Sequence, residues 1–220
     1  MHRNPTPIAI IAALVLAALP AAGLQPPGRS ATPPRIVCLG TSLTAGFGLD
    51  PEQAWPALVQ RKADEAGLRF RVVNAGVSGE TSAGALRRID WLLREPVAVL
   101  VVETGANDGL RGQEPESTRE NIRGIFARAG KQAPAPKLVL VGMQAPPNLG
   151  ADYTRRFRAL FPEVAKEHGA AFVPFLLEGV AGVARLNQAD GIHPTPEGQR
   201  IVAENVWRVL KPLLAASPAP

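Results

Sequence analysis

Three residues have the types and spacing that nucleophilic catalysis needs. Ser42 lies in a turn of small residues, Gly40-Thr41-Ser42-Leu43, directly after an apolar run. His193 follows Asp190 by three residues in a polar loop. At that spacing the carboxylate can accept from one ring nitrogen and set the tautomer, while the other nitrogen faces a hydroxyl. These residues predict a serine hydrolase site, against the alternative of two solvated loop residues before a helix.

A serine nucleophile needs a base, and the chain has three histidines. His2 falls in the predicted export signal. His168 ends a helical stretch directly before Gly169, a pattern typical of a helix C-terminus. His193 is therefore the favoured base.

Charge that develops on a carbonyl oxygen requires hydrogen-bond donors. The candidate donors are the backbone N–H groups of Ser42 and Gly79 and the side chain of Asn107. Gly79 allows a close backbone approach because it has no Cβ atom. Each residue alone is ordinary in a turn, so the prediction rests on their joint placement.

These residues follow short apolar runs that alternate with amphipathic stretches. The runs predict strands at 35–39, 70–74, 97–103, 137–143 and 171–174. Apolar residues recur at helical spacing within 55–66, 122–129, 157–164 and 202–213. This alternation predicts parallel βαβ units and a three-layer α/β/α domain. Because ligands bind at the carboxyl ends of such strands, the polar loops there should form the site. Pro162 should kink or split its helix.

The N-terminus has the order of a secretory signal. His2 and Arg3 precede an apolar run that ends in small residues. We predict a signal peptide over 1–23, a Pro-rich lead-in over 24–34, a hydrolase domain over 35–214 and a flexible tail over 215–220. The product should be periplasmic or secreted, with an uncleaved anchor as the alternative. The single cysteine, Cys38, lies in an apolar run and should be a buried small hydrophobe.

Composition excludes several classes. The chain has 220 residues, 46% of them hydrophobic and 20% charged, which fits one globular domain. The net charge of +5 is spread without basic runs, and 5% aromatic residues argue against a nucleic-acid partner. The turn after the first strand has neither a dinucleotide nor a P-loop fingerprint. Few histidines and cysteines make a metal site unexpected, and no cofactor is expected.

At four segments the sequence resembles the SGNH hydrolase family, also called GDSL-type esterases. The segments begin at Gly40, at Asn74, at Gly105 and at Asp190, in the family's order. The resemblance implies a flavodoxin-like sandwich with a five-stranded parallel sheet. It also implies that Ser42 is the nucleophile, His193 the general base and then acid, and Asp190 its orienter. Ser42, Gly79 and Asn107 are the implied oxyanion hole.

Within the family, three stretches look like the exported arylesterase and thioesterase/lysophospholipase branch. They are 54–58, 78–82 and 107–112. The resemblance implies hydrolysis of acyl esters and thioesters, a role in lipid metabolism and transient contact with membrane lipid. Thr41 stands where the name motif has Asp, and Ala106 where the third block has Gly. Neither departure removes a catalytic group, although Ala106 could tighten the acyl site.

Substrate selection is predicted from the loop after the fourth strand. Pro146, Leu149 and Tyr153 should form one wall of the acyl pocket, beside Ala106; a plain connecting loop is the alternative. The apolar residues 175–177 are expected in the core rather than in that wall. Two other functions stay open. One is a carbohydrate O-deacetylase or acyltransferase on the same scaffold, and the other is an exported α/β binding module.

Overall fold

The computed structural model describes residues 1–2 and 32–216, so residues 3–23 of the predicted signal peptide, most of the lead-in and the last four residues lie outside the described residues. Five parallel strands form one sheet in the order β2-β1-β3-β4-β5. The strands are β1 Arg35–Gly40, β2 Arg71–Gly76, β3 Val99–Glu103, β4 Lys137–Val141 and β5 Ala171–Val173. This is the flavodoxin-like order, which confirms the predicted fold class.

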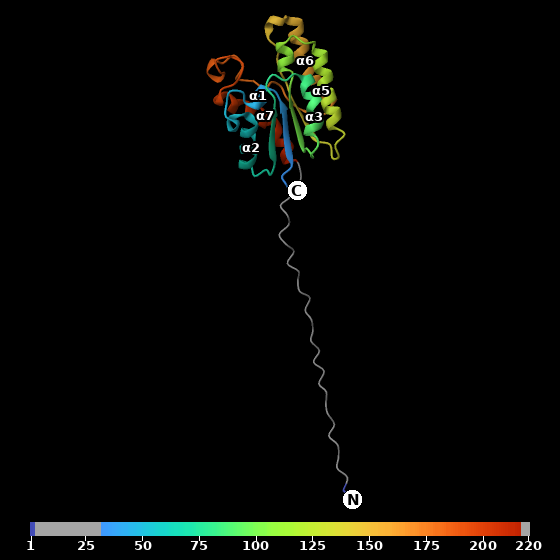
Figure 1. Cartoon of the computed structure of the whole chain (residues 1–220). Helices are drawn as coiled ribbons and strands as arrows, with labels where there is room; N and C mark the ends of the chain where they lie inside the picture. Colours follow the sequence, from blue (N-terminus) through green and yellow to red (C-terminus); the bar gives the residue numbers. More distant parts are fainter. Residues whose placement is uncertain (3–31, 217–220) are drawn as a thin grey trace. The chain divides into compact units, whose positions relative to one another are not determined.

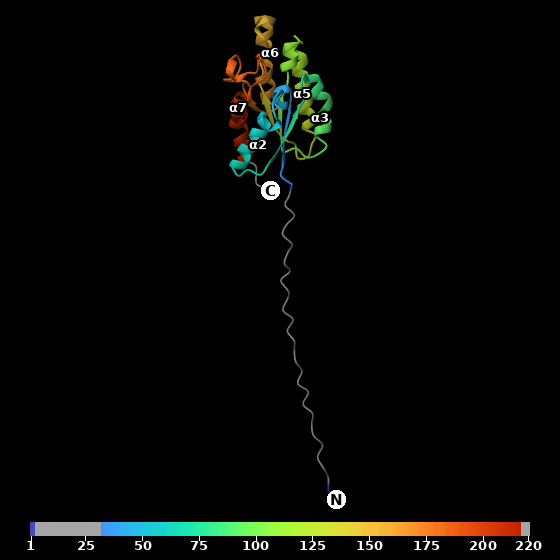
Figure 2. The same cartoon turned by 60° about the vertical axis from the view of Figure 1, so that its left-hand side comes forward.

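Helices cover both faces of the sheet. The α-helices are α1 Ser42–Ala45, α2 Trp55–Glu65, α3 Ser82–Leu92, α4 Ala106–Leu110, α5 Pro115–Ala129, α6 Ala151–Glu167 and α7 Pro196–Ala215. Short 3-10 helices are η1 Pro51–Gln53, η2 Pro147–Leu149 and η3 Ala184–Leu186. Helices α3, α5 and α6 pack together on one face, whereas α2 and α7 pack on the other (Figures 1 and 2). The predicted three layers are therefore present.

Burial explains why the central strands read as continuous apolar runs. Residues 36–39 of β1 and 99–103 of β3 are buried, because helices cover both faces of a parallel sheet. Cys38 is buried and free, as predicted, and burial raises the pKa of its thiol. Among the helices of the described residues, none has the length and apolar character to cross a membrane.

The strand bounds differ from the prediction by one or two residues. β3 begins at Val99 rather than Val97, because the Val97 N–H donates to the Gln132 side chain at 2.8 Å instead of entering the ladder. β4 ends at Val141 rather than Met143, and β2 runs on to Gly76. The carboxyl ends of β1, β2 and β3 still lie at the same edge, with Gly40 paired to Gly76.

Of the two outcomes predicted for Pro162, a kink or a split of its helix, the split is wrong. Helix α6 continues through Pro162 to Glu167. Proline removes the N–H that would bond the carbonyl of Arg158, but Pro162 is exposed, so water can replace that donor. His168 caps the end of α6, and its ring packs edge-on against Phe126 at a centroid distance of 5.3 Å. The structural interpretation of His168 agrees with this position.

Candidate active site

Ser42 begins a single helical turn immediately beyond β1. Thr41 is the N-cap of α1, and its side chain accepts from the Leu43 N–H at 3.4 Å. Gly46, at φ 77°, ends the turn in the left-handed conformation that favours glycine. The turn thus holds Ser42 at the carboxyl edge of the sheet, beside the point where the strand order reverses between β1 and β3.

His193 links Ser42 to Asp190. Its Nε2 lies 2.9 Å from Ser42 Oγ, and its Nδ1 lies 2.7 Å from Asp190 Oδ2. The other carboxylate oxygen, Oδ1, accepts from the backbone N–H groups of Ile192 and His193 at 2.9 and 3.0 Å. The structure therefore brings together the three residues predicted from sequence, in the geometry of a nucleophile, a base and an orienting acid.

Hydrogen bonds keep Asp190 ionised. Donation from the His193 backbone, the His193 ring and the Ile192 backbone lowers the pKa of Asp190 to about 2. A carboxylate that accepts several hydrogen bonds is stabilised in its charged form. Asp190 is therefore negative throughout the neutral range and can balance a positive charge on the imidazole.

Gln188 ties the histidine loop to the serine turn. Its side-chain amide donates to the carbonyls of Phe47 and Pro194 at 2.8 and 3.0 Å, and its N–H donates to the His193 carbonyl at 2.7 Å. The Phe47 ring lies 4.6 Å from the His193 ring, centroid to centroid. Sequence reasoning missed Gln188, because nothing local indicates a bond to a residue that is 141 positions away.

The predicted oxyanion donors lie around the same hollow. Ser42, Gly79, Asn107 and His193 all line a depression of about 200 Å³, here termed the Ser42 hollow. Gly79 has φ 76°, and nothing lies within 4 Å of where its Cβ would be. Asn107 donates one amide hydrogen to the Glu80 carbonyl at 2.9 Å, which fixes the orientation of the amide. Its second hydrogen is available to a ligand.

An ion pair braces the loop that carries Gly79. The Arg88 Nε lies 2.8 and 2.9 Å from the two carboxylate oxygens of Glu80. Its Nη2 also donates to the carbonyl of Ala75 at 2.7 Å. On the other side, Arg111 donates to the Gly79 carbonyl at 3.0 Å. These bonds hold the loop at the end of β2 in one conformation.

Asp108 fixes the helix that carries Asn107. Its buried carboxylate accepts from the Ser82 backbone at 2.9 Å, from the Ser82 hydroxyl at 2.5 Å and from Thr118 at 3.2 Å. Asn121 in turn donates to the Ser82 hydroxyl at 2.9 Å. The start of α4 is therefore bonded to α3 and α5, so the donor on Asn107 rests on a rigid support.

Glu103, the last residue of β3, is a buried carboxyl under the serine turn that sequence reasoning missed. Its Oε2 accepts from the Thr41 N–H at 2.9 Å and from the Thr44 hydroxyl at 2.7 Å, and the Thr41 hydroxyl donates to it at 3.0 Å. A Cβ on Gly40 would lie 2.8 Å from this carboxyl and 2.0 Å from Thr44 Oγ1, so only glycine fits. Threonine at position 41 can donate to Glu103, which an ionised aspartate could not.

We expect the stability difference between the protein and Glu103→Gln to depend on pH. Burial raises the pKa of Glu103 from 4.5 to about 7, so its contribution to folding is full below pH 4.5 and is lost as pH rises through 7. The glutamine stays neutral. From pH 5 to pH 8 the variant should therefore gain on the order of 3 kcal/mol relative to the native protein. Urea unfolding of both proteins at the two pH values measures this, and a difference that stays constant with pH contradicts it.

The predicted acyl wall is only partly where it was expected. An apolar groove of about 380 Å³ adjoins the Ser42 hollow; Ala106 and Pro146 line it, as do Phe175 and Leu177. Leu149 and Tyr153 line neither space. The Tyr153 hydroxyl donates to the Gln113 carbonyl at 2.6 Å. Its ring stacks on the Phe157 ring of the same helix, with the ring centroids 6.0 Å apart, so the side chain packs against α6 and the segment before α5.

The expectation for residues 175–177 also needs correction. Only Leu176 is fully buried in the core, whereas Phe175 and Leu177 reach the groove from the segment after β5. Three apolar residues in a row cannot all point inward on an extended or turning chain. Leu43, Ala106, Leu110 and Ile192 line both the groove and the Ser42 hollow, so the two spaces adjoin.

The chain is similar to known acylhydrolases both in sequence and in structure. The sequence profile of the GDSL-like Lipase/Acylhydrolase family matches residues 38–201. "Esterase TesA" of Pseudomonas aeruginosa is 45% identical over 180 residues, which are 81% of this chain and 89% of that protein. "Thioesterase 1/protease 1/lysophospholipase L1" of Escherichia coli K12 is 38% identical over 188 residues, with 84% and 88% covered. A crystal structure of TesA superposes with a TM-score of 0.77 at 44% identity, covering 81% of this chain and 99% of that one.

Proposed function

The chain belongs to the GDSL-like lipase/acylhydrolase family, and from that premise we propose that it cleaves acyl esters and thioesters through an acyl-enzyme on Ser42. It is a serine hydrolase of esterase type. The observation that carries the proposal is the continuous hydrogen-bonded line from Ser42 Oγ through His193 to Asp190. The names of the relatives, esterase and thioesterase, support the reaction class.

In the proposed acylation step, Ser42 Oγ attacks the acyl carbonyl and its proton passes to His193 Nε2. Asp190 holds the Nδ1 proton and balances the imidazolium charge. His193 then returns its proton to the leaving alcohol or thiol as the carbonyl–heteroatom bond breaks. In the second half, His193 takes a proton from water as the water oxygen attacks the acyl carbon. His193 then returns that proton to Ser42 Oγ as the bond between the acyl carbon and Ser42 Oγ breaks, which releases the carboxylic acid. Each half begins and ends with neutral His193.

The negative oxygen of each tetrahedral intermediate needs fixed donors. We propose the N–H groups of Ser42 and Gly79 and the Asn107 amide for this role, which agrees with their position around the Ser42 hollow. Because Glu80 holds the Asn107 side chain and Asp108 holds its helix, the amide needs little reorientation as charge develops on the oxygen.

The two arms of the ester are proposed to occupy different spaces. The leaving group must contact His193, which protonates it, and His193 lines the Ser42 hollow but not the apolar groove. The acyl arm remains on Ser42 and is directed into the groove beside Leu43 and Ala106. Apolar lining by Met143, Phe175 and Leu177 suits a hydrocarbon chain.

The test is hydrolysis of p-nitrophenyl acyl esters of increasing chain length, beside acyl thioesters of the same acids, by the purified mature protein. We expect turnover of both substrate types with a preference for chains longer than acetyl. Strict acetyl specificity, or acyl transfer to an added alcohol, would favour the deacetylase or acyltransferase alternative. Absence of any turnover would overturn the proposal.

Replacing Asn107 by Ala should lower kcat by about 10²–10³-fold, the usual effect of losing one oxyanion donor. KM should change little, because the donor acts mainly on the tetrahedral intermediate. Steady-state kinetics on one p-nitrophenyl ester measure this. Asn148→Ala, an exposed asparagine that lines neither space, is the matched control. Unchanged turnover in Asn107→Ala would remove Asn107 from the oxyanion hole.

The partners follow from the same site. A small-molecule ester is the substrate class that the family supports. We also propose transient contact with membrane lipid, because exposed Phe47, Leu110 and Ile192 line the Ser42 hollow. Failure of the Ser42→Ala protein to bind phospholipid vesicles would contradict that contact.

Export is proposed from the N-terminal sequence alone. An intact N-terminus on the exported protein would contradict cleavage of the predicted signal peptide.

A further inference from the structure

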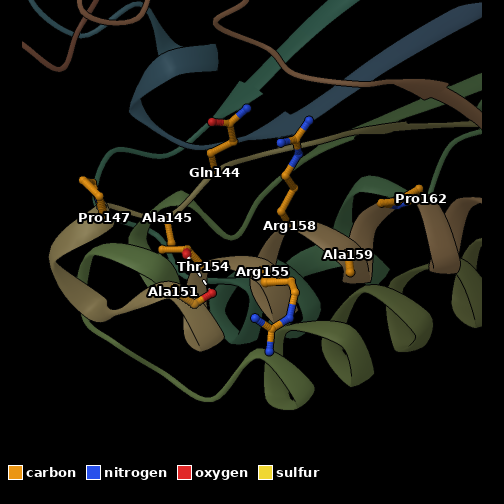
Figure 3. Close-up of a pocket in the computed structure, with 9 residues that line it drawn as sticks. All are labelled: Gln144, Ala145, Pro147, Ala151, Thr154, Arg155, Arg158, Ala159 and Pro162. Carbon is orange, nitrogen blue, oxygen red and sulfur yellow. Dashed lines mark hydrogen bonds between the residues drawn. The ribbon is translucent and has the colours of Figure 1, made fainter.

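A second space borders the apolar groove at residues other than those that the groove shares with the Ser42 hollow. It has a volume of about 750 Å³ and lies between helix α6 and the segment after β4, as Figure 3 shows. We term it the basic hollow; Gln144, Thr154, Arg155 and Arg158 are its polar lining residues. The catalytic residues do not line it, so the proposed mechanism gives it no role.

The basic hollow adjoins the apolar groove. Gln144, Ala145 and Pro147 line both spaces, and the groove in turn shares four residues with the Ser42 hollow. A linear molecule attached to Ser42 therefore meets three surroundings in order: the donors around the hydroxyl, an apolar stretch, and a wider space with charged side chains. That order matches an acyl chain with a polar group at its distal end.

One of the two positive charges of the basic hollow, on Arg158, is unpaired within the described residues. None of its nine lining residues is acidic. Arg155 pairs with Asp152, but Arg158 is exposed and has no carboxylate partner within the described part of the chain. In Figure 3 the Arg158 side chain extends from α6 toward the side of Gln144, whereas Arg155 leaves the helix in another direction. A guanidinium and a primary amide are the donors that a carboxylate accepts from.

We propose that the basic hollow binds the anionic end of an acyl arm, so that the protein prefers acyl esters whose chain carries a terminal carboxylate. Arg158 is the specificity-determining residue, with Gln144 as the second donor. The inference rests on the proposed esterase function and adds a substrate class to it. A hydrocarbon chain fills the groove in either case, so the selectivity lies at the distal end alone.

The expected size of the preference for a terminal carboxylate follows from the exposure of Arg158 to solvent. A solvated ion pair contributes little and is screened by salt, so a selectivity of about 3–10-fold is expected, decreasing at high ionic strength. The preference should depend on length, because a carboxylate on a short chain stays within the apolar groove, where its desolvation is unfavourable.

The experiment compares two series of p-nitrophenyl esters. One consists of half-esters of linear dicarboxylic acids of increasing length, and the other of the same compounds with the free carboxyl converted to its methyl ester. The readout is the ratio of kcat/KM for the charged and the neutral member of each pair. It is measured for the native protein, Arg158→Gln and Arg158→Glu, with Arg156→Gln as the matched control. Arg156 lies on the same helix but does not line the hollow, and it pairs with Asp152 and Glu114.

For the native protein and Arg156→Gln, we expect the ratio to rise with length by about 3–10-fold and to fall again in high salt. In Arg158→Gln the rise should disappear, and in Arg158→Glu the long charged esters should become worse substrates than their neutral partners. A ratio that does not rise with length, or that Arg158→Glu leaves unchanged, overturns the inference. The neutral series tests the proposed function separately, because it needs only Ser42, His193 and the groove.

Discussion

Replacing Ser42 by Ala is expected to lower kcat for p-nitrophenyl esters by about 10⁶-fold, the scale seen when a serine hydrolase loses its nucleophile. The hydroxyl is the atom that forms the acyl-enzyme, and its partner His193 Nε2 lies 2.9 Å away. Without the hydroxyl, the oxyanion donors can still stabilise direct attack by water on the ester, so a small residual activity remains. Steady-state kinetics with the purified variant measure the loss.

The control and the assignment need separate measurements. Ser117→Ala, an exposed serine on α5, should retain native kcat. Ser78 lines the same hollow as Ser42, so loss of activity alone does not identify the nucleophile. A serine-reactive phosphonate followed by peptide mass analysis does. Labelling of Ser78, or near-native turnover in Ser42→Ala, would refute the proposed mechanism.

Asp190→Asn should lower kcat by about 10⁴-fold, although it changes one atom. The two backbone N–H groups that donate to Asp190 Oδ1 will retain the carbonyl oxygen of the new amide. The amide nitrogen then faces His193 Nδ1, which must accept instead of donating. That tautomer carries its proton on Nε2, where Ser42 Oγ needs a base.

The effect of Asp190→Asn should lie in kcat over the whole neutral range. The pKa of Asp190 is about 2, so protonation of this carboxyl does not contribute to any loss of native activity between pH 5 and pH 8. pH profiles of kcat for the native protein and the variant test this, with Asp64→Asn as an exposed control. A loss of less than tenfold would show that Asp190 does not select the tautomer.

Sequence patterns predicted the sheet and the rim of the site well, because both depend on local signals. Strands of a sheet covered on both faces read as apolar runs, and parallel connection places their carboxyl ends together. Ser42, Gly79, Asn107 and His193 follow such runs or lie in rim loops, and they meet at one hollow. Their roles in the reaction remain predictions until the variants are measured.

The supports of the site could not be predicted in the same way. Glu103 reads as the last residue of an apolar strand, and only the position of the serine turn above it shows why a carboxyl is buried there. Asp108 and Gln188 act through partners on other elements. The prediction of the acyl wall was partly wrong for a related reason, because composition does not say whether Tyr153 or Phe175 turns toward the groove.

The Ser42–His193 bond joins residues 151 positions apart, and it has a consequence for how folding can be followed. The nucleophile begins α1, directly after the first strand, and the base lies in the loop before the last helix, so strands β2 to β5 and helices α2 to α6 lie between them. Recovery of ester hydrolysis after dilution from denaturant would therefore report long-range closure of the native topology rather than helix formation. Comparison of that recovery with far-ultraviolet circular dichroism would separate the slow pairing of distant segments from fast local structure.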